Sequence, residues 1–417
     1  MFDMPLSRTI DSANQDDFSA RLQQWRQAIL ADPALQHRLA MIEDPDQFIA
    51  ANHAEALHLD IALPATMVAN TVQPDPLGLD RFDQHLPNAS AWPGPGWRPI
   101  GLVPVQGDWA VDWAHFAGLA LTQPFYEDTL RKARQRPFNR LMRVRTSLTT
   151  LIETAPAQMT APDGLIFHLS RCGSTLVAQM LAAIPGATIL SEPPPLDGVI
   201  QLIQANLDLP MNSAVALVRA MASALGRPDH DGATGPFVIK LDSWHSRALP
   251  LLRLAFPDTP WIFLYREPID ILVSHHRIRG MQAVPGMLPD TIFDIPDSAS
   301  LSPDDYAARV LAAICQAVLD QPTMALGMLV NYSELPDAVV RRILPHFGIL
   351  PDPASQAAIT AASTRNAKAP HERFTPDTAE KRHSASPSII AAARLVADAY
   401  RALEEQRHAA LRDGDAR

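Results

Sequence analysis

Cysteine is scarce in this chain of 417 residues, which holds two, Cys172 and Cys315. Two cysteines cannot organise a disulfide framework, and this pair has no zinc-binding spacing. Long apolar runs are also missing, because no stretch approaches the roughly 18 residues needed to cross a bilayer. Asp11 and Ser12 stand where a signal peptide would continue with apolar residues. We therefore expect no metal, no membrane partner, no secretory signal and a reducing compartment, the cytoplasm.

Excess positive charge is missing as well. The 35 Lys and Arg residues are outnumbered by 45 Asp and Glu residues, for a net charge of −10. This balance argues against a nucleic-acid partner or a polybasic membrane surface, but it permits a local basic pocket for one anion. With 47% hydrophobic and 19% charged residues, the composition is that of a globular protein with a sizeable core. It gives no indication of the oligomeric state.

The N-terminal region, residues 1–90, is predicted to be a helical module. Phe18, Leu22, Trp25 and Leu30 recur near helical spacing, and the pairs Asp32-Pro33 and Asp44-Pro45 are typical helix starts. The sequence of residues 29–39, followed by that of 43–48, resembles the nif-eleven-type leader module found on some peptide natural-product precursors. An ordinary helical extension is the alternative. The resemblance would imply a peptide or natural-product acceptor.

Residues 91–160 are interpreted as a connector that packs on the catalytic domain. A helix is expected over 127–134, and Pro137 interrupts the pattern. Aromatic residues are frequent here: Trp92, Trp97, Trp109, Trp113, Phe116, Phe125, Tyr126 and Phe138.

Residues 161–417 are predicted to form the catalytic domain, because short apolar runs alternate with helical stretches from residue 164 onward. The expected strands are 165–169, 187–190, 237–241, 261–265 and 328–332. The expected helices are 174–184, 243–256, 268–278 and 388–412. Apolar strands separated by helices are typical of an α/β fold with a mostly parallel, doubly wound sheet.

The first of these strands leads into Ser-Arg-Cys-Gly-Ser-Thr, residues 170–175, and then into a helix. A helix N-terminus offers free backbone N–H groups and a positive dipole end, which suit an anion. Gly173 allows close approach, Ser174 and Thr175 add hydroxyl groups, and Arg171 adds positive charge. In the P-loop of ATP-binding proteins, a lysine occupies the position of Ser174. The cation here instead precedes the glycine by two residues, which argues against a magnesium-bound triphosphate.

A second motif follows the fourth strand, where Arg266 is followed eight residues later by Ser274. Arginine can clamp a phosphate with two hydrogen bonds. In order and spacing, the two motifs resemble those of sulfotransferases, whose P-loop-like fold binds 3′-phosphoadenylyl sulfate (PAPS) without a metal. Ser170 departs from the proline of the family's loop. The resemblance implies that PAPS is held by Ser170, Arg171, Cys172, Gly173, Ser174, Thr175, Leu176, Arg266, Ser274 and, from a late loop, Lys368.

The same resemblance implies the catalytic residues. Lys240, at the end of the third strand, would lie near the transferred sulfate together with Arg171. The base that deprotonates a hydroxyl or amine acceptor would be a carboxylate, and two candidates remain open. Glu192 follows the second strand, where carboxylate-using members have a Glu. Asp242 stands where other members have a histidine. The acceptor, a small molecule or a peptide, is not indicated.

Two other classes of function remain possible. One is a P-loop kinase, for which Asp242 could bind magnesium but position 174 lacks the lysine. The other is a non-catalytic protein that binds a nucleotide or a peptide.

Overall fold

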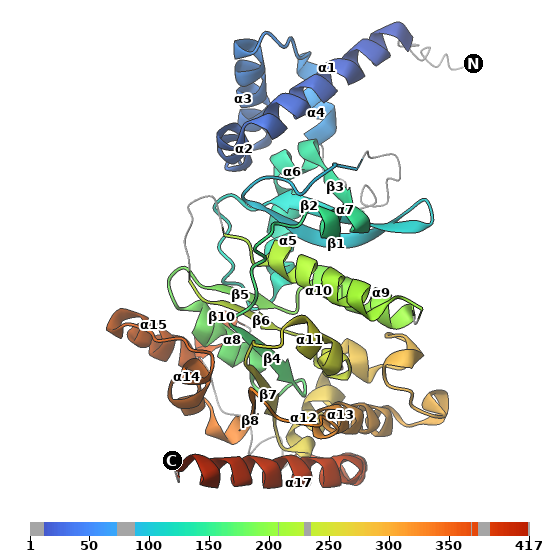
Figure 1. The fold of residues 1–417 in the computed structure, drawn as a ribbon, viewed down its shortest axis with the longest axis vertical. Coiled ribbons are helices and arrows are strands. Elements are labelled where there is room, and N and C mark those ends of the chain that lie inside the picture. Colours follow the sequence, from blue (N-terminus) through green and yellow to red (C-terminus); the bar gives the residue numbers. More distant parts are fainter. Residues whose placement is uncertain are drawn as a thin grey trace, which may run out of the picture. The chain divides into compact units, whose positions relative to one another are not determined.

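The computed structural model describes residues 12–72, 88–206, 208–228, 235–367, 369–373 and 384–415. The chain forms two compact units (Figure 1). The first comprises Met1–Leu119, Leu130–Thr154 and Arg227–Gly232, and the second comprises Ala120–Thr129, Ala155–Gly226 and Ala233–Arg417. The domain limits expected from the sequence stay a prediction.

The first unit begins with four helices, α1 (Ser12–Ala31), α2 (Pro33–Ala40), α3 (Pro45–His58) and α4 (Ala65–Val72). As expected, Asp32 and Asp44 cap α2 and α3. The side chain of Asp32 accepts hydrogen bonds from two backbone N–H groups of the first turn, and that of Asp44 accepts one. The buried face of α1 differs slightly from the prediction. Trp25 and Ile29 are fully buried, whereas Leu30 is 42% exposed.

An antiparallel sheet completes the first unit where the sequence indicated only a connector. Strands β1 (Trp97–Val105), β2 (Asp108–His115) and β3 (Val144–Ser147) pair in the order β1-β2-β3. Pro99 and Pro104 lie within β1, which is possible because β1 is an edge strand with one neighbour. The short helices α6 (Pro137–Met142) and α7 (Leu148–Glu153) flank β3. Helix α5 (Tyr126–Gln135) forms where residues 127–134 predicted it.

The second unit is built on the expected parallel sheet. Its strands are β4 (Gly164–His168), β5 (Thr188–Ser191), β6 (Phe237–Lys240), β7 (Trp261–Tyr265) and β8 (Gly327–Asn331). They lie in the order β5-β6-β4-β7-β8, and every neighbouring pair is parallel. The predicted α/β fold with a doubly wound sheet is therefore confirmed. Because the strands are parallel, the residues that follow them gather at one edge of the sheet.

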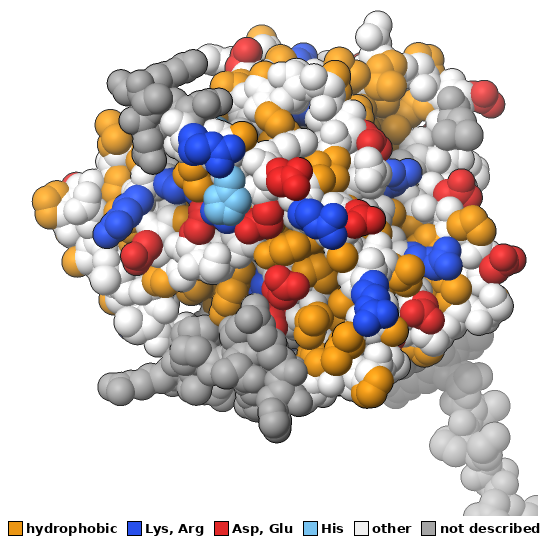
Figure 2. Space-filling model, turned by 90° about the horizontal axis from the view of Figure 1, so that it is seen from below, with side chains coloured by type: hydrophobic (Ala, Val, Ile, Leu, Met, Phe, Trp, Pro, Cys, Tyr) orange, Lys and Arg blue, Asp and Glu red, His pale blue; other side chains and the backbone are white. Residues whose placement is uncertain are grey.

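Helices cover both faces of this sheet, and alternate strand residues show which helix packs where. Leu264 belongs to a buried cluster with α8 (Ser174–Ala182), residues 338–347 and Ile359 of α15 (Pro353–Ser363). Its neighbour Tyr265 points the other way and packs on Tyr400 of α17 (Pro387–Asp415). On that side α17 packs against α12 (Pro268–Arg277) and α13 (Pro303–Leu319). Acidic and basic side chains are interspersed on the face of the molecule that carries α17 (Figure 2).

The predicted helix over 243–256 is divided in two. Residues Ser243–Ala248 form a 3-10 helix, and α11 (Leu249–Ala255) follows it. The division falls at Pro250, which has no N–H group and therefore favours the first turn of a helix. Helices α9 (Pro194–Ala205) and α10 (Met211–Leu225) precede β6. Among the described helices, none combines the length and apolar character needed to cross a membrane.

Candidate anion-binding site

The loop between β4 and α8 has an unusual backbone. Ser170, Arg171 and Gly173 have φ values of 57°, 50° and 88°, all in the left-handed region. At Gly173 a side chain is also excluded by packing, because a Cβ there would lie 2.8 Å from atoms of Leu335 and of Tyr332. The loop thus turns sharply and directs the first N–H groups of α8 into the space beyond the strand. Left-handed non-glycine residues are costly and persist where the surroundings hold them.

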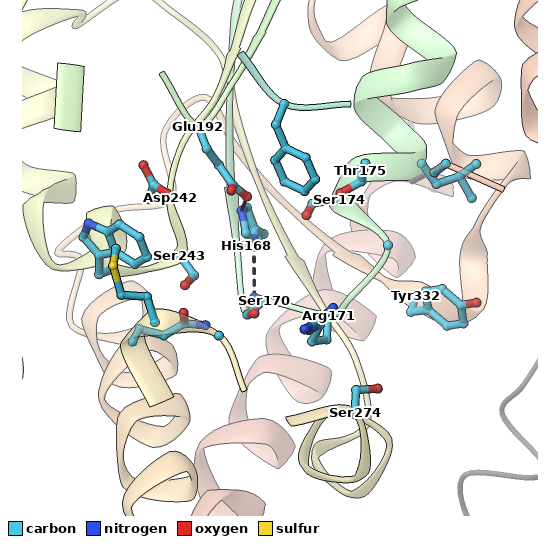
Figure 3. Close-up of a pocket in the computed structure, with 18 of the residues that line it drawn as sticks. His168, Ser170, Arg171, Ser174, Thr175, Glu192, Asp242, Ser243, Ser274 and Tyr332 are labelled. Atoms are coloured by element: carbon cyan, nitrogen blue, oxygen red, sulfur yellow. Dashed lines mark hydrogen bonds and ion pairs between the residues drawn. The ribbon is translucent and has the colours of Figure 1, made fainter. Parts of the chain in front are cut away.

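A cavity of about 640 Å³ opens over this loop at the carboxyl edge of the sheet (Figure 3). Most of the predicted site residues line it: Ser170, Arg171, Gly173, Ser174, Thr175, Leu176, Glu192, Asp242 and Ser274. The chain contributes further lining residues that the sequence did not indicate: Phe125, Glu127, His168, Ser243, Trp244, Gly280, Met281, Gln282, Tyr332, Asn366 and Ala367. The structure therefore brings the loop, one end of α12 and both candidate carboxyl groups around one space.

Three predicted site residues lie behind the lining. Lys240 is fully buried, and Cys172 packs in the hydrophobic core with its Sγ 3.2 Å from the carbonyl oxygen of Leu264. Burial raises the pKa of the Cys172 thiol to about 11, so the group is a neutral thiol. Arg266 donates to Asp270 (Nε to Oδ2, 3.1 Å) and stacks 4.0 Å from the centre of the Tyr332 ring. Lys368 lies outside the described residues.

The loop also makes contact with the end of α12. Arg171 donates a hydrogen bond of 2.8 Å from Nη2 to the carbonyl oxygen of Ile278, just beyond that helix. Ser274 lines the cavity one turn before this point, and its hydroxyl donates to the carbonyl oxygen of Asp270 at 2.9 Å. Arg171 and Ser274 therefore face the same cavity from two different elements.

Glu192 and Lys240 form an ion pair at the edge of the sheet. The pairing follows from the strand order, because Ser191 at the end of β5 lies beside Lys240 at the end of β6. Lys240 Nζ also lies 5.3 Å from the centre of the Phe125 ring. Burial disfavours the charged form of Glu192, but Lys240 and His168 outweigh it and hold the pKa of this carboxyl below its usual range. Glu192 is thus a carboxylate at neutral pH.

Asp242 has the opposite electrostatic setting. Burial and the nearby carboxyl groups of Glu192 and Asp197 raise its pKa well above the usual value for aspartate. The raised pKa favours the protonated form of Asp242, and that form can donate a hydrogen bond but cannot take a proton. The two candidate bases are therefore not equivalent, and the charges favour Glu192.

Asp197, Asp242 and His245 have potential metal-ligand atoms within 4.8 Å of one another. Hydrogen bonds within the protein already engage Asp197 and His245 of this cluster. Asp197 Oδ1 accepts from Trp244 Nε1 at 2.7 Å and lies 2.8 Å from His245 Nε2, while His245 Nδ1 accepts from the backbone N–H of Asp242 at 3.3 Å. The imidazole thus bridges a side chain and the backbone.

His168 is the most informative residue that sequence reasoning missed. It is the last residue of β4, and its ring lies between Glu192 and the start of the loop (Figure 3). The signal was present, because this histidine interrupts an otherwise apolar run two residues before the loop. Phe125, Tyr332 and Asn366 lie far from the motifs along the chain, and no local pattern marked them as part of the site.

Comparisons with known proteins give only distant similarities. No protein-family model matches the chain, and no curated protein matches it. Among solved structures, a sulfotransferase from Mycobacterium avium matches with 15% identity and a TM-score of 0.38, over 59% of this chain and 77% of that one. The sulfotransferase domain of the Synechococcus PCC 7002 olefin synthase matches with 18% identity and a TM-score of 0.35, over 58% and 97%. At these scores the similarity is too distant to assign an activity.

Proposed function

We propose that the protein is a sulfotransferase that moves a sulfuryl group from PAPS to a hydroxyl or amine of an acceptor. One observation carries this proposal. Residues of the loop from Ser170 to Leu176 line the same cavity as Glu192, whose carboxylate pairs with the buried Lys240. An anion cradle without the P-loop lysine, opposite a carboxylate that can accept a proton, suits a phosphosulfate donor and a neutral acceptor. The cytoplasm, with its reducing conditions, fits two free, buried thiols.

In the proposed reaction, the acceptor hydroxyl or amine gives its proton to Glu192 while its oxygen or nitrogen bonds to sulfur. The bond between sulfur and the bridging oxygen of the phosphosulfate breaks, and that oxygen keeps the electron pair. Adenosine 3′,5′-bisphosphate leaves with this additional charge. Arg171 and the N–H groups at the start of α8 would stabilise the charge, as fixed donors do in other group transfers.

Lys240 would link the two halves of this step. In the free protein its ammonium group pairs with Glu192 and lowers the pKa of that carboxyl group, which makes the carboxylate a weaker base. If the ammonium turns toward the bridging oxygen as charge develops there, Glu192 loses its cation and becomes a stronger base. Proton removal and departure of the leaving group would then assist each other.

The first test is binding of adenosine 3′,5′-bisphosphate, measured by calorimetry. The variant Arg171→Ala should weaken binding by about 10- to 100-fold, because it removes a charged hydrogen-bond donor to an anion. Arg247→Ala is a matched control, since Arg247 also donates to a backbone carbonyl, that of Ile292 at 3.1 Å, but does not line the cavity. Unchanged affinity in Arg171→Ala would contradict the binding site.

The second test separates the proposal from a kinase. The purified protein should release adenosine 3′,5′-bisphosphate from PAPS in the presence of a suitable acceptor, with chelators present. Magnesium-dependent ATP turnover without PAPS turnover would show instead that the loop serves a nucleoside triphosphate.

A further inference from the structure

His168 contacts two residues of the site that have left-handed backbones, Ser170 and Glu192. Its Nδ1 accepts a hydrogen bond of 3.0 Å from the backbone N–H of Ser170, the first left-handed residue of the loop. Its Nε2 lies 3.4 Å from Oε1 of Glu192, which is also left-handed, with a φ of 53°. The side chain is buried, so water competes little for either contact.

The backbone N–H of Ser170 fixes the protonation state of the ring. Because Nδ1 must accept this hydrogen bond, the proton of the neutral imidazole lies on Nε2, the atom that faces Glu192. Burial lowers the pKa of His168, and the positive charge of Lys240 acts in the same direction. The ring is therefore neutral and has a fixed orientation, with an acceptor toward the loop and a donor toward the carboxylate.

We propose that His168 is a positioning residue that couples the anion-binding loop to the carboxylate, so that the loop and Glu192 hold their positions together. The effect of this coupling on sulfuryl transfer rests on the proposed function. The coupling itself is a property of the ligand-free protein. The loop and Glu192 follow two strands that are not neighbours, since β6 lies between β4 and β5. The side chain of His168 spans the distance between these two strand ends. Lys240, at the end of β6, is buried behind the cavity wall and pairs with the same carboxylate, that of Glu192.

Two substitutions separate the two contacts of the His168 ring, because each keeps one contact and removes the other. In His168→Asn the amide oxygen can take the place of Nδ1 and accept from Ser170, but the side chain is too short to reach Glu192. In His168→Gln the longer amide can reach Glu192, but the acceptor at the Nδ1 position is lost. If the coupling is real, the two variants should fail in different ways.

Hydrogen exchange of the ligand-free full-length protein tests whether His168 holds the loop, without any assumption about the reaction. Peptides that cover residues 169–173 should exchange roughly 2- to 10-fold faster in His168→Gln, because one backbone hydrogen bond is lost. They should stay close to wild type in His168→Asn. His346→Asn is the control, since His346 contacts carbonyl oxygens of Trp261 and Leu326 in the same unit and does not line the cavity. Equal exchange in the two His168 variants would overturn the proposal. If His168→Gln does not fold, His168→Ala is used in its place, because it removes the same hydrogen-bond acceptor.

Binding and turnover then show what the coupling does. His168→Gln should weaken the binding of adenosine 3′,5′-bisphosphate, whereas His168→Asn should bind it normally and lose kcat. The reverse assignment, or equal losses in both, would contradict the role given to each nitrogen. If wild type does not bind this nucleotide, the sulfotransferase proposal fails, while the exchange comparison still decides whether His168 holds the loop.

Discussion

Asp242 and Glu192 are carboxyl groups on the wall of one cavity, yet their surroundings move their pKa values in opposite directions. Lys240 pairs with Glu192, whereas Asp242 is buried beside two other carboxyl groups. We therefore expect Glu192→Gln to lower kcat by about 10²- to 10⁴-fold, the usual effect of removing a general base. Asp242→Asn imitates the neutral acid and should change kcat far less. Single-turnover assays with PAPS measure both, and a larger loss in Asp242→Asn would assign the base to Asp242 instead.

At the residue scale, the sequence predicts best those site residues that follow one another along the chain. Residues 170–176 were identifiable because strand, turn and helix follow one another directly. The contact of His168 with Glu192 depends on the strand order β5-β6-β4, which no local pattern contains. Arg266 shows the same limit. Its place in the motif predicts a phosphate contact, but only the structure shows its pairing with Asp270 and its stacking on Tyr332.

At the scale of elements, α17 is attached to the sheet through polar groups. Arg407 is buried and donates to Glu334 and Glu404, and the hydroxyl of Tyr265 donates to Glu404. Arg407→Met should therefore lower the free energy of unfolding by about 1–3 kcal/mol, because the partly buried carboxylates of Glu334 and Glu404 lose a charged donor. The control is Arg401→Met on the same helix, whose pair with Asp398 is exposed and should be worth less than about 0.5 kcal/mol. Urea unfolding of the two variants measures the difference, and equal effects would show that α17 is held by its apolar contacts.

Helices α9, α10 and α13 of the second unit were not expected from the sequence. The five parallel strands of this unit were predictable because each reads as an apolar run. The antiparallel sheet of the first unit was not, since β1 contains two prolines and β2 mixes aromatic with acidic residues. A strand at an edge tolerates proline, so residues that look like a connector can still form a ladder. The sequence therefore predicts a parallel sheet of apolar strands better than an antiparallel sheet whose strands contain proline and charged residues.

At the scale of the whole molecule, His168 and Asp242 should make stability depend on pH in opposite ways. The pKa of His168 is lowered in the folded state, so below about pH 6.5 the unfolded chain binds the additional proton and stability falls as the pH falls. The pKa of Asp242 is raised, so above about pH 4 the folded state holds a proton that the unfolded chain releases, and stability falls as the pH rises. Glu192 and Lys240 face both groups, and Asp197 also faces Asp242.

This sign difference can be measured by thermal unfolding between pH 4 and pH 8. Relative to wild type, Asp242→Asn should gain stability as the pH rises above 4 until it passes the folded-state pKa of Asp242, because Asn carries no proton that folding must retain. His168→Asn should instead improve relative to wild type as the pH falls from 7 to 5, whatever its loss at neutral pH. The slopes are the decisive readout, since a simple packing defect shifts the curve by the same amount at every pH. A pH-independent difference for Asp242→Asn would mean that this carboxyl group is ionised in the folded protein, and Asp242 would then again compete with Glu192 as the base.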